Sequence, residues 1–254
     1  MYLTFKIGKE SDICSAAEDG DLDALIECLS KGFAIDYEDY GMTLIHLAAE
    51  YGHIDCCNLL ISKGANVSAK LQCGSTPLHL AAQWGHKNCC ELLISNGAAV
   101  GEKDSEGSTP LKLAVWSGWT SCCDLLISKG AKVEEKSRDG ITLLHWASYF
   151  GPNGVFDLLL SEGVNVEETD NFGRTPLDWA ASNIESQYRC ERLISKGADV
   201  RKKDIHGRTP LHTAAERGNK YCLDLLISHG ADINEKDQEG NTPLHLATPK
   251  KKLI

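Results

Sequence analysis

Histidine and cysteine are the residues of this sequence that could bind a metal ion or carry redox chemistry. The chain has nine histidines and 11 cysteines in 254 residues. Six of the cysteines are neighbours in pairs, at positions 56–57, 89–90 and 122–123. Neighbouring residues on a helix diverge by about 100°, so such a pair cannot present two sulfurs to one zinc ion as C-x-x-C does. C-x-x-C is absent from the sequence, and the cysteine pattern predicts no metal site.

Five of the histidines recur at one place in a repeated phrase, and four of the cysteines share another place. The histidines are His46, His79, His145, His212 and His245. Packed helices lie about 8–10 Å apart, too far for consecutive imidazoles to share a metal with bonds of about 2 Å. We expect these side chains to bond instead to the adjacent threonine and to the neighbouring loop. Cys56, Cys89, Cys122 and Cys222 are expected to pack as small apolar side chains, with a redox role as the alternative.

Motifs for catalysis are absent. The sequence contains no H-E-x-x-H, no G-x-S-x-G and no glycine-rich phosphate loop with its lysine, which predicts a non-enzyme without cofactor. The net charge of −10 disfavours nucleic acid as a partner. No run approaches the ~20 apolar residues that span a bilayer, so no membrane insertion is expected. Many cysteines without a signal peptide indicate the cytosol or the nucleus.

A phrase of the type G-x-T-P-L-H-x-A-A recurs along the chain and indicates how these residues are positioned. Its glycines are spaced by 33 residues, and once by 34, at Gly41, Gly74, Gly107, Gly140, Gly173, Gly207 and Gly240. Thr76 is a good N-cap, and Pro77 suits the first position of a helix. Gly85 and Gly97 can each end a helix in the left-handed conformation. Two short helices cannot bury their apolar faces alone, so the sequence predicts stacked helix pairs.

The 33-residue period and the T-P-L-H-x-A phrase resemble the ankyrin-repeat family. The resemblance implies an all-α ankyrin-repeat solenoid of helix-turn-helix units with short β-turn or hairpin tips. We place an N-terminal tail at 1–10 and the repeat domain at 11–254. The expected repeats are a cap at 11–40, then 41–73, 74–106, 107–139, 140–172, 173–206 and 207–239, and a partial repeat at 240–254.

The atypical repeats lead to further expectations. Ser11 takes the place of the capping threonine, so the first helix is expected to begin there. Gly151-Pro152 predicts a late start for the second helix of the fourth repeat, and the fifth repeat has one extra residue. Either the helix of the partial repeat caps the stack, or the chain is part of a longer one.

The resemblance also implies a binding surface, made of the tips and of the two residues before each helix-ending glycine. Aromatic side chains are enriched at the latter position. The candidate partner-binding residues are Tyr51, Trp84, Trp116, Tyr149, Phe150, Glu216 and Arg217, with Tyr40 and Phe172 at the tips. The alternative is that the rings only cover grooves between repeats. Asn234 is similar to asparagines that are hydroxylated in other ankyrin repeats.

The predicted function is non-catalytic binding of one or more proteins by a monomer acting as scaffold, adaptor or stoichiometric inhibitor. The alternative is a recognition part of a larger enzyme or channel. Charge is uneven, with a net −9 over residues 1–55 and +3 over 174–208. Such a gradient could orient a partner.

Overall fold

In five of the described repeats, the first helix begins at a threonine whose backbone N–H donates to a histidine three residues later. In the computed structural model, Thr76 is extended (φ −100°, ψ 168°) and Pro77 opens helix α5 (Pro77–Gln83). The backbone N–H of Thr76 donates to Nδ1 of His79 at 3.1 Å, so the imidazole proton lies on Nε2. That Nε2–H donates to the carbonyl of Ser108 in the next loop at 3.0 Å. The expected structural role of this histidine is therefore confirmed.

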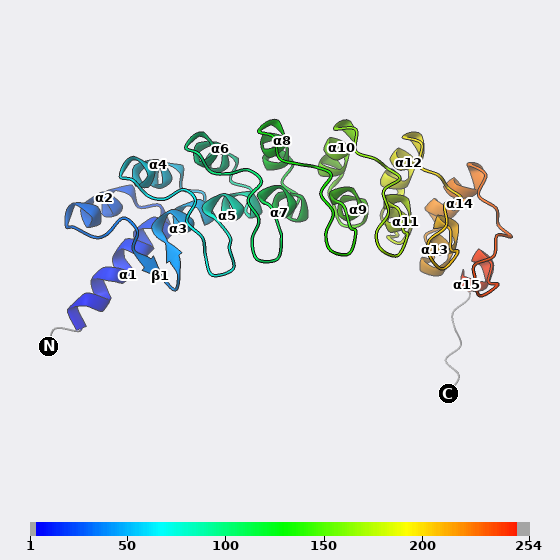
Figure 1. The fold of residues 1–254 in the computed structure, drawn as a ribbon, viewed down its shortest axis with the longest axis horizontal. Coiled ribbons are helices and arrows are strands. Elements are labelled where there is room, and N and C mark those ends of the chain that lie inside the picture. Colours follow the sequence, from blue (N-terminus) through cyan, green and yellow to red (C-terminus); the bar gives the residue numbers. More distant parts are fainter. Residues whose placement is uncertain (1–3, 248–254) are drawn as a thin grey trace. The chain divides into compact units, whose positions relative to one another are not determined.

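The structure describes residues 4–247, with side chains from residue 12 onwards, and divides into two units at residues 132 and 133 (Figure 1). The elements of the first unit are α1 (Thr4–Asp19), α2 (Leu22–Ser30), β1 (Glu38–Asp39), β2 (Met42–Thr43), α3 (Leu44–Glu50), α4 (Ile54–Ser62), α5, α6 (Lys87–Ser95), α7 (Pro110–Ser117) and α8 (Thr120–Ser128). The elements of the second unit are α9 (Leu143–Tyr149), α10 (Asn153–Ser161), α11 (Pro176–Ala181), α12 (Gln187–Ser195), α13 (Pro210–Arg217), α14 (Lys220–Ser228) and α15 (Pro243–Ala247).

Each unit is an all-α stack of helix pairs with short tips. In the first unit, α1, α3, α5 and α7 pack in succession as the first helices of their repeats, and α2, α4, α6 and α8 form a second row (Figure 1). In the second unit, α9, α11, α13 and α15 form the first row, and α10, α12 and α14 the second. Leu78, Ala81 and Ala82 are fully buried between the rows, as are Cys90 and Leu93 of α6. The expected apolar stripe is confirmed.

Two expectations about helix starts are wrong. Helix α1 begins at Thr4, so Ser11 lies inside the helix rather than at its N-cap, and the residues placed in a tail are helical from Thr4 onwards. Helix α10 begins at Asn153, 13 residues after Gly140, and α6 begins 13 residues after Gly74. Pro152 therefore does not delay α10, because a proline is tolerated at the N-cap and disturbs only the helix interior. Residues 248–254 of the partial repeat lie outside the described residues.

The tips are held by an aspartate and by backbone bonds between repeats. Oδ1 of Asp104 accepts from the N–H groups of Glu106 (3.0 Å) and Ser108 (2.7 Å), which closes the turn. The N–H of Ser105 donates to the carbonyl of Cys73 at 2.8 Å and so links two tips. In the second unit, Asp170, Asp204 and Asp237 close equivalent turns.

The tip of the first hairpin differs from the others. Strands β1 and β2 pair in antiparallel register around Tyr40 and Gly41, which both have positive φ (48° and 79°). This is the backbone of a type I′ turn, in which glycine, asparagine and aspartate are favoured. Tyr40 is therefore strained, and its side chain is 99% exposed.

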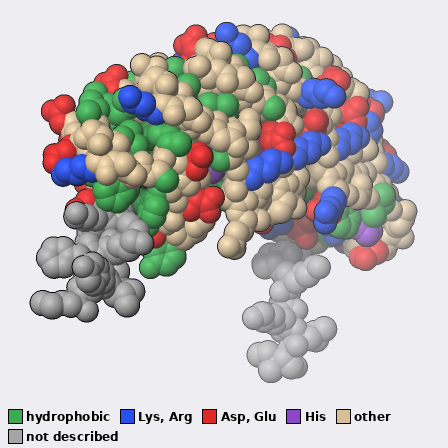
Figure 2. Space-filling view, turned by 60° about the vertical axis from the view of Figure 1, so that its left-hand side comes forward, with side chains coloured by type: hydrophobic (Ala, Val, Ile, Leu, Met, Phe, Trp, Pro, Cys, Tyr) green, Lys and Arg blue, Asp and Glu red, His purple; other side chains and the backbone are tan. Residues whose placement is uncertain are grey.

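Lysine–glutamate pairs join neighbouring repeats within each unit. In three of them the lysine lies 32 residues before the glutamate: Lys70–Glu102 in the first unit, and Lys136–Glu168 and Lys203–Glu235 in the second. Lys202–Glu167 in the second unit has the reverse order and a separation of 35 residues. On the face that Figure 2 shows, Lys and Arg side chains accordingly lie beside Asp and Glu side chains. Exposed pairs of this kind contribute only about 0–1 kcal/mol each, so they favour one register more than they stabilise the fold.

Candidate protein-binding surface

Three aromatic side chains of the first unit project from equivalent helix ends. Tyr51 and Trp84 directly follow α3 and α5, and Trp116 is the second-last residue of α7. Because α3, α5 and α7 pack in succession, the rings lie at the same end of adjacent first helices, with Trp116 one repeat position earlier than Tyr51 and Trp84. They are 47%, 51% and 46% exposed, respectively. About half of each ring is therefore accessible.

The other half of these rings has neighbours within the unit. The hydroxyl of Tyr51 donates to a carboxylate oxygen of Glu18 at 2.8 Å, and the ring stacks on His53. The ammonium of Lys112 lies 4.8 Å from the centre of the Trp116 ring. These contacts hold the rings in place without burying them.

In the second unit, aromatic side chains surround an open pocket of about 430 Å³. Its lining comprises Trp146, Tyr149, Phe150, Arg174, Asp178, Trp179, Ser182, Asp204, Arg208, Thr213, Glu216 and Arg217. The rings contact one another: Phe150 lies 4.3 Å from Tyr149 and 5.4 Å from Trp146, measured between ring centres. Trp179 meets Trp146 edge-on at 5.7 Å. The pocket therefore has a wall of four connected rings.

Ionisable side chains complete this pocket. Arg174 pairs with Asp170 at 2.8 Å, and its guanidinium lies 5.1 Å from the centre of the Trp179 ring. Arg208 pairs with Glu216 at 3.0 Å. The carboxyl of Asp178 accepts hydrogen bonds from the N–H and the hydroxyl of Thr175, both at 2.8 Å. Burial nevertheless raises the pKa of Asp178 to about 7.

The remaining predicted site residues are placed as follows. Tyr149 is half-buried against Phe150, whereas Phe150 is 66% exposed. Glu216 and Arg217 lie at the exposed end of α13, and Phe172 is exposed at a tip. Asn234 is exposed in the loop after α14, and its hydroxylation stays a prediction. Tyr149, Phe150, Glu216 and Arg217 come together in the pocket.

Sequence reasoning missed Trp146 and Trp179, the two indoles of the pocket. Both occupy the sixth place after the repeat glycine, where the repeats of the first unit have Leu47, Leu80 and Leu113. Aromatic residues at an otherwise aliphatic repeat position were the signal that could have identified them.

Trp119 was also missed, and it binds the preceding repeat. Its indole N–H donates to the carbonyl of Gln83 at 2.9 Å. His53 and His86 make equivalent bonds through Nε2 to the carbonyls of Glu18 and Glu50, both at 2.8 Å. The side chain at this repeat position therefore donates a hydrogen bond to a carbonyl near the end of the first helix of the preceding repeat.

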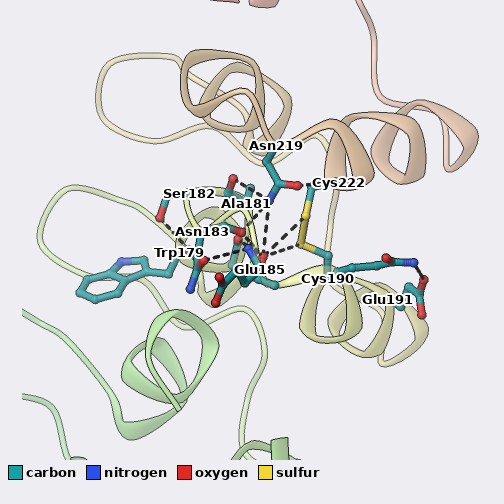
Figure 3. The surroundings of a disulfide bond; sticks show 12 residues. Trp179, Ala181, Ser182, Asn183, Glu185, Cys190, Glu191, Asn219 and Cys222 are labelled. Carbon is teal, nitrogen blue, oxygen red and sulfur yellow. Dashed lines mark hydrogen bonds between the residues drawn. A yellow bond between two sulfur atoms is a disulfide. The ribbon is translucent and has the colours of Figure 1, made fainter. Parts of the chain in front are cut away.

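Two cysteines are not free, which corrects the expectation for Cys222. Cys222 and Cys190 form a disulfide between α14 and α12 (Figure 3). Asn219 lies beside it and donates from its amide to the carbonyl of Asn183 at 2.7 Å. The other nine cysteines are free, and Cys56, Cys89 and Cys122 are buried as expected. Among the described side chains, no group of three or more His, Cys, Asp or Glu could hold a metal ion.

The comparisons with known proteins agree with these repeats. The sequence model of a family described as ankyrin repeats, three copies, matches residues 8–71, 64–137, 131–204 and 184–253. The chain belongs to the ankyrin-repeat family. A crystal structure of the human ASB11 ankyrin repeat domain is similar to this ankyrin-repeat chain, with a TM-score of 0.75 and 30% sequence identity. The match covers 82% of this chain and 93% of that one. Among curated proteins, none matches the sequence.

The family establishes the general class of activity. Ankyrin repeats are generally protein–protein interaction modules, and the fold is generally non-catalytic. Within residues 4–247, none of the helices combines the length and the apolar character needed to cross a bilayer.

Proposed function

We propose that this ankyrin-repeat chain is a non-catalytic monomer that binds one or more proteins, as a scaffold, an adaptor or a stoichiometric inhibitor. The binding surface comprises the exposed rings at the ends of the first helices. The observation that carries the proposal is the half-exposed state of Tyr51, Trp84 and Trp116 at the C-terminal ends of the first helices of adjacent repeats. Aromatic side chains dominate the energetics of protein interfaces when they become desolvated.

Preorganisation is the mechanism by which this surface gains affinity. The hydrogen bond of Tyr51 and the cation contact of Trp116 fix the rings before a partner arrives. Little side-chain entropy is then lost on binding. A location in the cytosol or the nucleus is part of this proposal: nine free cysteines support it, and the disulfide between Cys190 and Cys222 counts against it.

Affinity purification with quantitative mass spectrometry tests the proposal. The bait is the full chain, compared with a Trp84→Ala, Trp116→Ala double variant and with Tyr221→Ala. Tyr221 is a matched control because it is 60% exposed but lies on α14, in the row of second helices. We expect the double variant to lose partners that the wild type and Tyr221→Ala retain, at an unchanged thermal midpoint. Equal capture by all three baits, or a large fall in the midpoint with capture retained, would contradict the proposal.

A further inference from the structure

We infer that the pocket of the second unit binds an acidic partner segment, in which a carboxylate follows or precedes an apolar side chain. This inference rests on the proposed function and adds the chemistry of the partner. The apolar side chain would lie against Trp146, Phe150 and Trp179. The carboxylate would meet the arginines at the rim of the pocket.

The acidic groups of the pocket are already occupied within the protein. Burial raises the pKa of Asp178 to about 7 and so holds it partly in the neutral form, and its carboxyl already accepts two hydrogen bonds from Thr175. Oδ1 of Asp204 accepts from the N–H groups of His206 and Arg208, both at 2.8 Å. Glu216 is bound to the guanidinium of Arg208. Each of these carboxyl groups therefore has a partner within the chain.

The arginines, by contrast, keep positive charge at the surface. Arg217 is exposed, and no hydrogen bond or ion pair is seen for its side chain in the part of the chain that the structure describes. Arg174 is paired with Asp170, yet 41% of its side chain is exposed. The lining has three arginines against three carboxyls, and one of these, Asp178, is partly neutral because burial raises its pKa to about 7. The pocket therefore favours a carboxylate over an ammonium group.

The size and shape of the pocket fit a short peptide segment. A volume of about 430 Å³ lies in the range of ordinary ligand sites, which is about 300–1,000 Å³. Guanidinium groups bind carboxylates through paired, charge-assisted hydrogen bonds, and these gain strength beside apolar surface. A peptide with one apolar side chain beside one carboxylate would contact both the aromatic wall and the arginines of the pocket.

Peptide selection tests this inference on the full chain. Phage-displayed random 12-residue peptides are selected, and enriched peptides are resynthesised with a fluorescein label together with versions in which Asp and Glu become Asn and Gln. Binding is measured by fluorescence anisotropy to the wild type, Arg217→Glu and Arg138→Glu. Arg138 is the matched control, because it is an exposed arginine of the same unit outside the pocket.

We expect enrichment of Asp or Glu beside Leu, Phe or Trp. The Kd should rise about tenfold or more in Arg217→Glu, in Phe150→Ala and with the amide versions, and less than about twofold in Arg138→Glu. Neutral or basic consensus peptides, an unchanged Kd in Arg217→Glu, or no selected peptide at all would overturn the inference. Partner capture that depends on Trp84 and Trp116 would leave the proposed function intact in each of these cases.

A separate observation concerns the cysteines of the second helices. The disulfide between Cys190 and Cys222 joins α12 to α14, with the residues 32 apart in sequence and 6.3 Å apart between Cα atoms. The first unit repeats this arrangement with the same separation, in Cys57 with Cys89 and Cys90 with Cys122. These pairs link α4 to α6 and α6 to α8, respectively.

The helices that carry these pairs pack against each other in the same way, α4 on α6 and α6 on α8. Cys57 and Cys89 lie close enough to affect each other's ionisation, and so do Cys90 and Cys122. These contacts raise the pKa of Cys57 and Cys90 and lower the pKa of Cys89 and Cys122. All four side chains are buried among the helices. The pairing follows from the stacking, because the second cysteine of one repeat lies opposite the first cysteine of the next.

We propose that these two pairs are disulfide-forming sites, oxidised by a peroxide. One thiol attacks the peroxide O–O bond as its thiolate, and the proton that it gives up joins the leaving hydroxide, which yields a sulfenic acid and one water. The partner thiol then attacks the sulfenic sulfur in the same way, and its proton joins the leaving hydroxide as a second water, so that two thiols and one peroxide give one disulfide and two waters. Each cross-link would join the second helices of neighbouring repeats as the bond between Cys190 and Cys222 does.

Mass spectrometry of the full chain tests this proposal. The protein is treated with hydrogen peroxide, blocked with N-ethylmaleimide in denaturant and digested without reductant. We expect four alkylated thiols to be lost and cross-linked peptides that join residue 57 to 89 and residue 90 to 122. Cys89→Ser should remove only the first link, whereas Cys56→Ser on the same α4 helix as Cys57 should retain both. Absence of these links, or links between other cysteines in their place, would overturn the proposal.

Discussion

The indole N–H of Trp119 donates a hydrogen bond to the carbonyl of Gln83, the last residue of the helix one repeat earlier. The bond joins α8 to α5 through a carbonyl that has no partner within its own helix. Trp119→Phe should therefore lower the free energy of unfolding by about 1 kcal/mol, measured by urea denaturation. Trp84→Phe is the matched control, because the Trp84 ring is 51% exposed, and it should leave stability unchanged. Equal effects of the two changes would refute the structural role of Trp119.

Gly85 lies directly against the same indole. It has φ +82°, and a Cβ at this position would lie 2.4 Å from a ring atom of Trp119. Gly97 has φ +95° but no atom within 4 Å of such a Cβ. Both alanine substitutions should cost about 1 kcal/mol of backbone strain, and Gly85→Ala should cost clearly more because of the clash. Adding Trp119→Ala should remove the excess, and a double-mutant cycle without coupling would contradict this account.

Acid should destabilise the protein through its buried histidines. Burial lowers the pKa of His46 to about 4, and it also lowers the pKa of His79 and His145. The unfolded chain thus binds protons that the folded chain does not, between pH 6.5 and about 4. The contribution of these neutral histidines to the free energy of unfolding is fully present above pH 6.5. It falls as the pH drops toward 4, by about 3 kcal/mol for His46 alone. His46→Gln should flatten this slope in urea unfolding curves, whatever its effect at neutral pH.

Asp178 should give the opposite dependence on pH. Its pKa is raised from 3.8 to about 7 by burial, so the folded chain retains a proton that the unfolded chain loses between these values. Its contribution is therefore greatest below pH 3.8 and declines as the pH rises to about 7, by at most about 4 kcal/mol. Asp178→Asn keeps an acceptor for Thr175 and cannot titrate. The stability difference between Asp178→Asn and the wild type should grow from pH 4 to 7, and a constant difference would show that Asp178 titrates normally.

The strained hairpin tip separates stability from recognition. Asparagine suits the positive φ of Tyr40 better than tyrosine does, so Tyr40→Asn should raise the free energy of unfolding by about 0.5–1 kcal/mol. If the 99% exposed ring belongs to the binding surface, the same variant should bind a purified partner more weakly. Differential scanning calorimetry can measure the stability of the variant, and titration calorimetry can measure its affinity for the partner on the same preparation. A loss of stability would contradict the strain assigned to this turn.

The parts of the fold that sequence could predict are local. The cap formed by Thr76, Pro77 and His79 lies within four residues, so its chemistry can be identified from the order of residue types alone. The family resemblance implied the exposed helix ends, and Trp84 and Phe150 lie there as expected.

The parts that sequence did not predict depend on contacts between repeats. Trp179 contributes to the pocket because α9 and α11 bring it against Trp146, a contact that spans one repeat length. The bond of Cys190 with Cys222 depends likewise on how α12 and α14 stack. We predicted the role of Cys222 from its own repeat position. The partner of Cys222 is Cys190, at the second cysteine position of the preceding repeat, and this contact appears only when the repeats are stacked.

The separation of 32 residues that three lysine–glutamate pairs share has a consequence for how such a chain can change in length. Lys70 meets Glu102, and Lys203 meets Glu235, across the same 32 residues. When one whole period is duplicated or removed, each lysine keeps its distance along the chain from a residue at the glutamate position of the next repeat. The pair at the new junction can then still form. An insertion of another length would move these three pairs out of register. Gene segments of one period are therefore the natural units of growth for this protein.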